Sequence, residues 1–172
     1  VECAEEIRNR ISGPIDFAVA FYSHRYGDAV AKLAAQLNDA LSPGVFLSCT
    51  GESIVGGQYE IEDAPALSVW AASLLGVSVT PLRLEFQKTP EGPTITGWPD
   101  VLAGPWPSGA TLVVLGEPYS FPADWLLERL NSDRPGVPVV GGMASGGHGP
   151  GQNLLGLGRQ SFTSGAVAAL LH

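Results

Sequence analysis

The stretch that decides the fold is Ile15-Asp16-Phe17-Ala18-Val19-Ala20-Phe21-Tyr22. Both of its alternating faces are apolar, a pattern typical of a strand that is covered on both sides. A helical stripe of apolar residues follows at positions 30–41, with Asp28 as the expected N-cap and Pro43-Gly44 as the expected stop. The sequence therefore predicts a buried strand that leads into an amphipathic helix.

Further strands are expected on both sides of a proline-rich segment. Before it the apolar runs are residues 45–50, 59–62, 66–74 and 81–87, and after it they are 111–115, 137–140 and 164–171. A second helix opens at Pro122 and is expected to bury Leu126, Leu127 and Leu130. Equivalent positions recur at a nearly constant offset: Phe17 with Val113, Val45 with Val137, and Ser68 with Ser164. This offset predicts an internal duplication.

The order of these elements favours a layered α/β fold. Helices that alternate with strands are typical of such layers, and short links between the later strands of each half indicate antiparallel pairs. We expect a mixed sheet with packed helices, built from two similar strand-helix-strand-strand halves. The single domain divides into a leading helix (1–14), a first half (15–88), a Pro-rich connection (89–109) and a second half (110–172). Prolines exclude regular helix or central strand from the connection.

Composition limits the partners and the location. The chain has 172 residues, 45% of them apolar, so one domain can bury its own core. The 9 Lys and Arg residues are scattered and the net charge is −8, so no nucleic-acid partner is expected. No apolar run reaches the roughly 20 residues that cross a bilayer, so no membrane partner is expected. The N-terminus lacks a secretory pattern and only Cys3 and Cys49 are present, which predicts a cytoplasmic protein with free thiols.

Two glycine-rich turns occupy equivalent places in the two halves, so we expect the sheet to bring them to the same edge. Backbone N–H groups exposed by glycines can bind a carboxylate, which fits an amino-acid-like ligand. Glycines can also serve only to let the chain turn tightly. The candidate ligand-binding residues are Cys49, Thr50, Gly51, Glu52, Gly141, Gly142, Ser145, Gly146 and His148.

Three side chains carry alternative interpretations. Glu52 can bind a ligand ammonium group or be a solvated carboxylate. His148 can ligate a haem iron or be a surface histidine. Cys49 can act as a nucleophile with His24 or His148 as base, but a cysteine at the end of an apolar strand is more often a small buried hydrophobe. Because no catalytic signature surrounds it and no ligand pair has metal-binding spacing, we expect neither an enzyme nor a metal site.

Several blocks of the sequence, in order, resemble the N-terminal FIST domain. They are Asp16-Phe17-Ala18-Val19-Ala20-Phe21-Tyr22-Ser23, Ser48-Cys49-Thr50-Gly51-Glu52, Gly116-Glu117-Pro118-Tyr119-Ser120-Phe121, Val139-Val140-Gly141-Gly142-Met143-Ala144-Ser145-Gly146-Gly147 and Ser164-Gly165-Ala166-Val167-Ala168-Ala169-Leu170. In the third block Glu117 stands where the family has Asp. Because the blocks recur in the family's order from about Asp16 to the end, the resemblance is more specific than any one of them.

The resemblance implies an intracellular sensory domain that binds a small polar ligand such as an amino acid. It implies that a partner domain, the C-terminal FIST half of the full-length protein, relays the signal. Some relatives are similar to haem-containing nitric oxide sensors, so a haem-based gas sensor is one alternative. An F-box relative works in ubiquitin ligation, so the other alternative is a protein-interaction or substrate-capture module. That module would use the connection 89–108 with Trp98 and Trp106.

Overall fold

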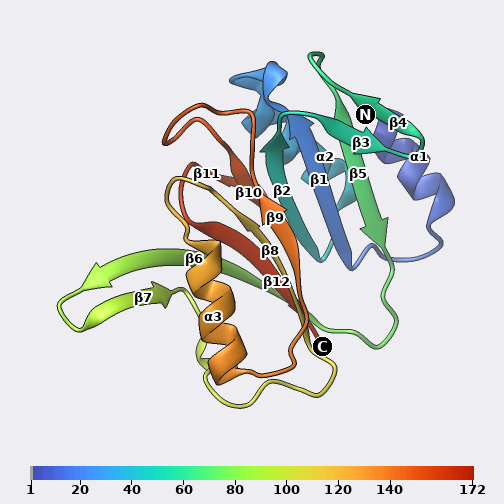
Figure 1. Ribbon diagram of the computed structural model, residues 1–172. Helices are drawn as coiled ribbons and strands as arrows, with labels where there is room; N and C mark the ends of the chain where they lie inside the picture. Colours follow the sequence, from blue (N-terminus) through green and yellow to red (C-terminus); the bar gives the residue numbers. More distant parts are fainter. Residues whose placement is uncertain (1) are drawn as a thin grey trace.

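Two five-stranded mixed sheets face each other in the computed structural model, which describes residues 2–172 (Figure 1). In spatial order, the first sheet contains β11 (Gln160–Phe162), β10 (Leu155–Leu157), β2 (Val45–Gly51), β1 (Phe17–Ser23) and β5 (Leu67–Ala72). The second contains β7 (Gly92–Thr96), β6 (Val79–Thr89), β12 (Ala166–Leu171), β8 (Thr111–Gly116) and β9 (Val139–Met143). A small hairpin pairs β3 (Ile54–Gly56) with β4 (Tyr59–Ile61).

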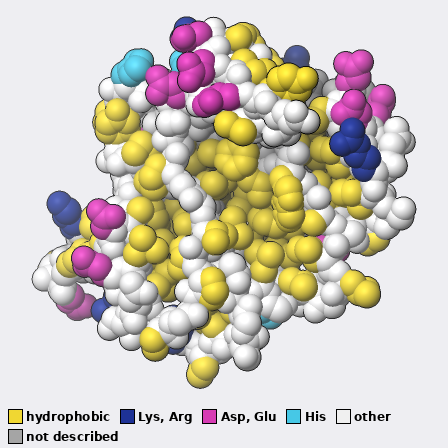
Figure 2. Space-filling view, turned by 45° about the vertical axis from the view of Figure 1, so that its right-hand side comes forward, with side chains coloured by type: hydrophobic (Ala, Val, Ile, Leu, Met, Phe, Trp, Pro, Cys, Tyr) yellow, Lys and Arg dark blue, Asp and Glu magenta, His cyan; other side chains and the backbone are white. Residues whose placement is uncertain are grey.

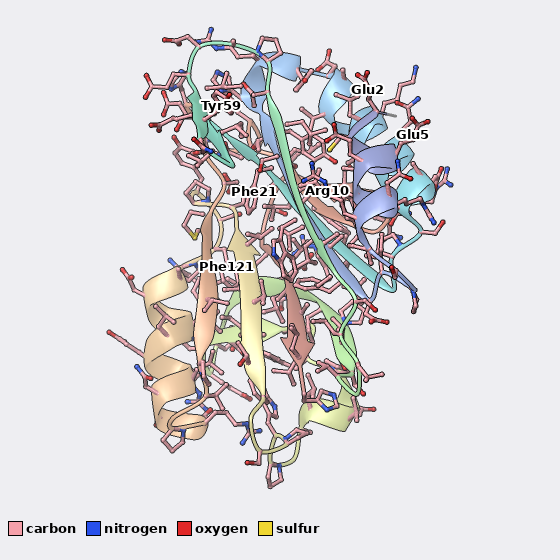
Figure 3. All side chains as sticks on the ribbon, turned by 90° about the vertical axis from the view of Figure 1, so that its right-hand side faces the viewer. Glu2, Glu5, Arg10, Phe21, Tyr59 and Phe121 are labelled. Atoms are coloured by element: carbon pink, nitrogen blue, oxygen red, sulfur yellow. The ribbon has the colours of Figure 1, made fainter. Side chains whose placement is uncertain are left out.

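Helices cover the outer faces of both sheets. α1 (Glu2–Arg10) and α2 (Ala29–Leu41) pack on the first sheet, and α3 (Ala123–Asp133) packs on the second. Two short 3-10 turns, η1 (His24–Tyr26) and η2 (Asp100–Leu102), complete the elements. Figure 3 shows α1 and α3 on opposite outer sides of the molecule. The layers therefore run helix, sheet, sheet, helix, which confirms the predicted α/β class.

Strand β1 is buried on both faces, as its sequence predicted. Phe17 and Val19 belong to the apolar cluster between the two sheets. Ala18 and Tyr22 belong to the cluster under α1 and α2. At 25 cal/mol per Å² of buried apolar surface, each large side chain removed from water in this way contributes about 1.5–3 kcal/mol.

The two sheets share a local topology. In the first, β1 and β2 are parallel and joined by α2, with β5 antiparallel beside β1. In the second, β8 and β9 are parallel and joined by α3, with β12 antiparallel beside β8. This agrees with the expected strand-helix-strand-strand halves. The halves also exchange strands, because β6 of the first half lies in the second sheet, and β10 and β11 of the second half lie in the first sheet. Their origin by duplication stays a prediction.

Helix α2 begins and ends where the sequence predicted, and one expectation about α3 was wrong. Asp28 is the N-cap residue of α2, although its side chain makes no capping hydrogen bond. The last helical residue is Leu41, the left-handed backbone of the cap Ser42 lets its N–H donate to the Asn38 carbonyl, and Pro43-Gly44 follow directly as the expected stop. Leu127 is 42% exposed, because α3 buries only the Leu126 and Leu130 side of its apolar stripe.

Sequence patterns also misplaced parts of the sheets. The run 66–74 was expected to be a buried strand, but it forms the edge strand β5, and Trp70 is 53% exposed. The pair Gly141-Gly142 lies inside β9 rather than in a turn. The β10–β11 hairpin was missed, because it consists of two three-residue strands.

The Pro-rich connection is more ordered than its prolines suggested. It contains β7, an edge strand in which Pro93 is tolerated because its missing N–H faces away from a partner, and η2. The rings of Trp98 and Trp106 lie 5.7 Å apart, and the Trp106 indole N–H donates to the Leu102 carbonyl at 3.1 Å. Both tryptophans pack against the core under α3, so they anchor the connection.

None of the helices within residues 2–172 has the length and apolarity needed to cross a lipid bilayer.

Candidate functional site

A groove of about 420 Å³ lies where the two sheets meet, at the carboxyl ends of β1, β2, β8 and β9. Ligands of α/β proteins commonly bind at the carboxyl ends of parallel strands. The lining residues are Phe21, Cys49, Thr50, Gly51, Ser53, Ile54, Val55, Leu115, Gly141, Gly142, Met143 and Ser145. Figure 3 shows Phe21 at the junction between the sheets, and Figure 2 shows hydrophobic side chains gathered into one patch with acidic side chains along its upper rim.

Hydrogen bonds fix the two glycine-rich segments to each other across this junction. The Ser145 amide donates to the Thr50 carbonyl at 3.1 Å, and the Glu52 amide donates to Ser145 Oγ at 3.0 Å. Thr50 is also engaged by the 144–155 segment, because its Oγ1 accepts from the Leu154 amide at 3.1 Å. The segments therefore come from different sheets and meet across the gap, instead of sharing one sheet edge.

Six of the nine predicted site residues line the groove, and three lie outside it. Those that line it are Cys49, Thr50, Gly51, Gly141, Gly142 and Ser145. Glu52 is exposed at its border through its bond to Ser145. Gly146 packs against His24: a Cβ there would lie 2.4 Å from His24 Nδ1. His148 is exposed, and its amide donates to Gln152 Oε1 at 2.8 Å, so it closes a turn.

Gly141 has a structural reason to be glycine. Its φ is +143°, and a Cβ at this position would lie 1.8 Å from the Val114 carbonyl oxygen. No side chain fits between β8 and β9 there. Gly142 differs, because a Cβ at that position would have nothing within 4 Å. The first glycine is thus required by sheet packing, while the second keeps the strand surface bare.

The Cys49 thiol does not suit nucleophilic chemistry. Its side chain is only 5% exposed and belongs to the apolar cluster between the sheets. Burial raises the pKa of Cys49 to about 12, so the thiolate is scarce at neutral pH. These observations favour the interpretation of Cys49 as a small buried hydrophobe over the interpretation as a nucleophile.

The groove offers haem neither a histidine nor a thiolate ligand. None of its lining residues is a histidine, and its one thiol, Cys49, is protonated by burial, which leaves the thioether of Met143 as the lining group that can bind a haem iron. Across residues 2–172, no group of three or more His, Cys, Asp or Glu side chains has an arrangement that could hold a metal ion. The residues present therefore do not fit a haem held by histidine or thiolate in this groove.

Sequence reasoning missed a buried carboxylate beside the site. Glu117 is fully buried and accepts from Ser120 Oγ at 2.7 Å, from the Tyr119 amide at 3.1 Å and from Asn153 Nδ2 at 3.2 Å. Asn153 Oδ1 in turn accepts from the Gly147 amide at 3.0 Å. This network ties the turn after β8 to the loop that carries Ser145. The 116–121 block was a visible signal, but nothing local shows that the carboxylate is buried.

Fold and groove together define a layered α/β domain with a candidate binding site between two sheets. The FIST N domain family model matches residues 16–172. The chain therefore belongs to the FIST N domain family, a family of sensory domains, as the sequence blocks predicted.

Two similar curated proteins come from mycobacteria. The chain is 36% identical over 172 residues to "Uncharacterized protein MT0656" of Mycobacterium tuberculosis (strain CDC 1551 / Oshkosh). It is 35% identical over 173 residues to "Uncharacterized protein Mb0898c" of Mycobacterium bovis. Each match covers 99% of this chain, but the chain spans only 43% of the length of each relative. No solved structure shows significant similarity to the chain.

Proposed function

We propose that this domain binds a small amino-acid-like ligand in the groove between its sheets and relays binding through a partner domain. The observation that carries the proposal is the meeting of the two glycine-rich segments in that groove, held by the Ser145–Thr50 hydrogen bond. Such a site is partly apolar with a few convergent polar groups, which is the usual composition of small-molecule sites.

The apolar wall favours a ligand with a hydrophobic side chain. Phe21 and Met143 are 36% and 38% exposed, and both line the groove beside the buried Leu115. Apolar side chains that stay accessible in this way gain from burial against a ligand, at roughly 25 cal/mol per Å². Amino acids such as leucine, methionine or phenylalanine fit this wall better than charged ones.

The polar rim supplies groups for the ligand's charged end. Ser145 Oγ accepts a hydrogen bond from the Glu52 amide, which leaves its own O–H free to donate to a carboxylate. The Ser53 hydroxyl lines the same groove. The exposed Glu52 carboxylate at the border is placed to attract the ligand ammonium group.

The proposal that a partner domain relays binding rests on the length of the relatives. More than half of each mycobacterial relative lies outside the matched region. A further domain over the groove would close it and respond to its occupation, because a ligand shifts an equilibrium only through contacts that differ between two states.

A thermal-shift screen of the chain against the twenty amino acids tests the proposal. A ligand at about a hundred times its Kd adds roughly 2.7 kcal/mol, which raises the midpoint by about 5–11 °C for a chain of this length. Phe21→Ala should reduce the shift produced by a hydrophobic amino acid, while Val101→Ala, an exposed change in η2, should leave it intact. No shift with any amino acid, or equal shifts in both variants, contradicts the proposal.

A further inference from the structure

Strand β9 presents an unpaired edge. Within residues 2–172 it pairs only with β8, in parallel. The Leu112 amide donates to the Pro138 carbonyl at 2.9 Å, and the Ala144 amide donates to the Gly116 carbonyl at 2.8 Å. Because backbone groups alternate along a strand, those of residues 138, 140, 142 and 144 face β8. The N–H and C=O groups of residues 139, 141 and 143 therefore point away from the sheet.

This edge lacks the features that usually protect one. Exposed edge strands commonly carry charged residues, prolines or bulges that prevent pairing with another chain. The sequence of β9, VVGGM, has none of them, and Val140 is 51% exposed. Gly142 leaves open space where a side chain would stand. By contrast β7, at the other edge of the same sheet, contains Pro93.

Hollows lie on both faces of the β9 edge. One, of about 170 Å³, lies between β9 and α3 and is lined by apolar residues that include Phe121, Leu126 and Leu127. The other is the groove between the sheets, whose lining shares Gly141, Gly142 and Met143 with the first. Side chains of an added strand would point alternately to the two faces. One set would enter the α3 hollow and the other would cover the groove.

We propose that β9 accepts an extended strand from another domain of the same polypeptide, with apolar side chains at alternate positions. The backbone of an extended strand can hydrogen bond to the alternating donors and acceptors along the β9 edge, and the hollows on the two faces then select its side chains. The mycobacterial relatives supply a source for the strand, because more than half of their length lies outside the matched region. The inference shares the partner domain of the proposed function but requires no ligand.

Hydrogen exchange at residues 141 and 143 tests the proposal. Their amides should exchange rapidly in the isolated chain. They should become at least tenfold slower when residues 1–172 replace the matched region in the M. tuberculosis relative. Val140→Lys should restore rapid exchange in that longer protein, because a lysine protects an edge. Val101→Lys, at a position in η2 that is 77% exposed, is the matched control and should leave the protection intact.

A synthetic peptide separates strand pairing from other causes of protection. The probe is an acetylated and amidated octapeptide that alternates valine with threonine between terminal lysines. It should slow exchange at 141 and 143 in the isolated chain, whereas the same peptide N-methylated on its central residues should not. Two results overturn the proposal. The first is rapid exchange at residues 141 and 143 that persists in the longer protein. The second is slow exchange in the isolated chain that disappears on dilution to a monomer, because this would show that the edge pairs with a second copy of the chain.

Discussion

The amide of Ser145 donates a 3.1 Å hydrogen bond to the carbonyl of Thr50, and this bond joins the ends of two strands that belong to different sheets. Ser145 also accepts from the Glu52 amide through its Oγ. Ser145 thus joins the two walls of the groove by two hydrogen bonds, beside the bond from the Leu154 amide to Thr50 Oγ1. Any ligand held between the sheets would meet a border that is already fixed by backbone contacts.

Ser145→Ala should weaken that border. The substitution removes the acceptor for the Glu52 amide but keeps the backbone bond to Thr50. A lost hydrogen bond of this kind costs about 1 kcal/mol, so thermal denaturation should show a midpoint about 2–4 °C lower. Ser161→Ala, an exposed change in β11, is the control and should have no effect. Equal midpoints for the two variants would show that the Ser145 hydroxyl does not stabilise the junction.

The two glycines of β9 should respond differently to alanine. At Gly141 the new Cβ would lie 1.8 Å from the Val114 carbonyl oxygen, so Gly141→Ala should cost about 3 kcal/mol or more in the free energy of unfolding. Gly142→Ala places its methyl group in open space and should change that free energy by less than about 0.5 kcal/mol. Urea denaturation of both variants measures the difference. Similar losses would mean that β8 and β9 are not this close.

Glu117→Ala should loosen the loop that carries Ser145. It leaves the Ser120 hydroxyl, the Tyr119 amide and Asn153 Nδ2 without their acceptor in a buried place, at a cost of about 2–4 kcal/mol. Glu117→Gln keeps one oxygen but turns an amide group toward donors, so we expect an intermediate loss. Hydrogen exchange at Gly147, whose amide binds Asn153, should accelerate in both variants. Unchanged exchange at Gly147 would show that the loop is held by other contacts.

Local sequence patterns were sufficient to predict the elements whose buried residues recur at a regular spacing. The double-faced apolar alternation of Phe17 to Tyr22 and the stripe in α2 predicted β1 and its helix, because burial on fixed periods leaves a mark in the sequence. Such patterns did not predict how the strands are divided between two sheets, because an apolar run does not show which strands it pairs with. The β10–β11 hairpin was not predicted for a related reason, because Gly156 and Gly158 interrupt the alternation of apolar and polar residues there.

The candidate site was predictable in outline only. Glycine-rich segments after two strands suggested that Cys49 to Gly51 and Gly141 to Ser145 would lie together, and they line one groove. That they bind a ligand stays a prediction. The positions of Gly146 and His148 outside the groove depend on contacts with His24 and Gln152, and the burial of Glu117 depends on Asn153, 36 residues away. Such contacts between distant residues carry no local signature.

Cys49 should make the protein less stable at alkaline pH. Burial raises its pKa from the usual 9.0 to about 12, so between these values the unfolded chain releases the thiol proton while the folded chain keeps it. The unfolded state then binds fewer protons, and the free energy of unfolding falls as pH rises above 9. The loss between pH 9 and 10.5 should be about 2 kcal/mol, at roughly 1.4 kcal/mol per pH unit.

Cys49→Ala should lack this part of the alkaline loss. Burial also raises the pKa of Tyr22, so a smaller decline should remain in the variant above pH 10. Urea denaturation at pH 8, 9 and 10.5 measures the difference, with Cys3→Ala as the control because Cys3 is only partly buried. Iodoacetamide at pH 8 should label Cys3 and spare Cys49 in the folded protein. Labelling of Cys49 under these conditions, or parallel declines in wild type and Cys49→Ala, would contradict its burial as a protonated thiol and reopen the nucleophile hypothesis.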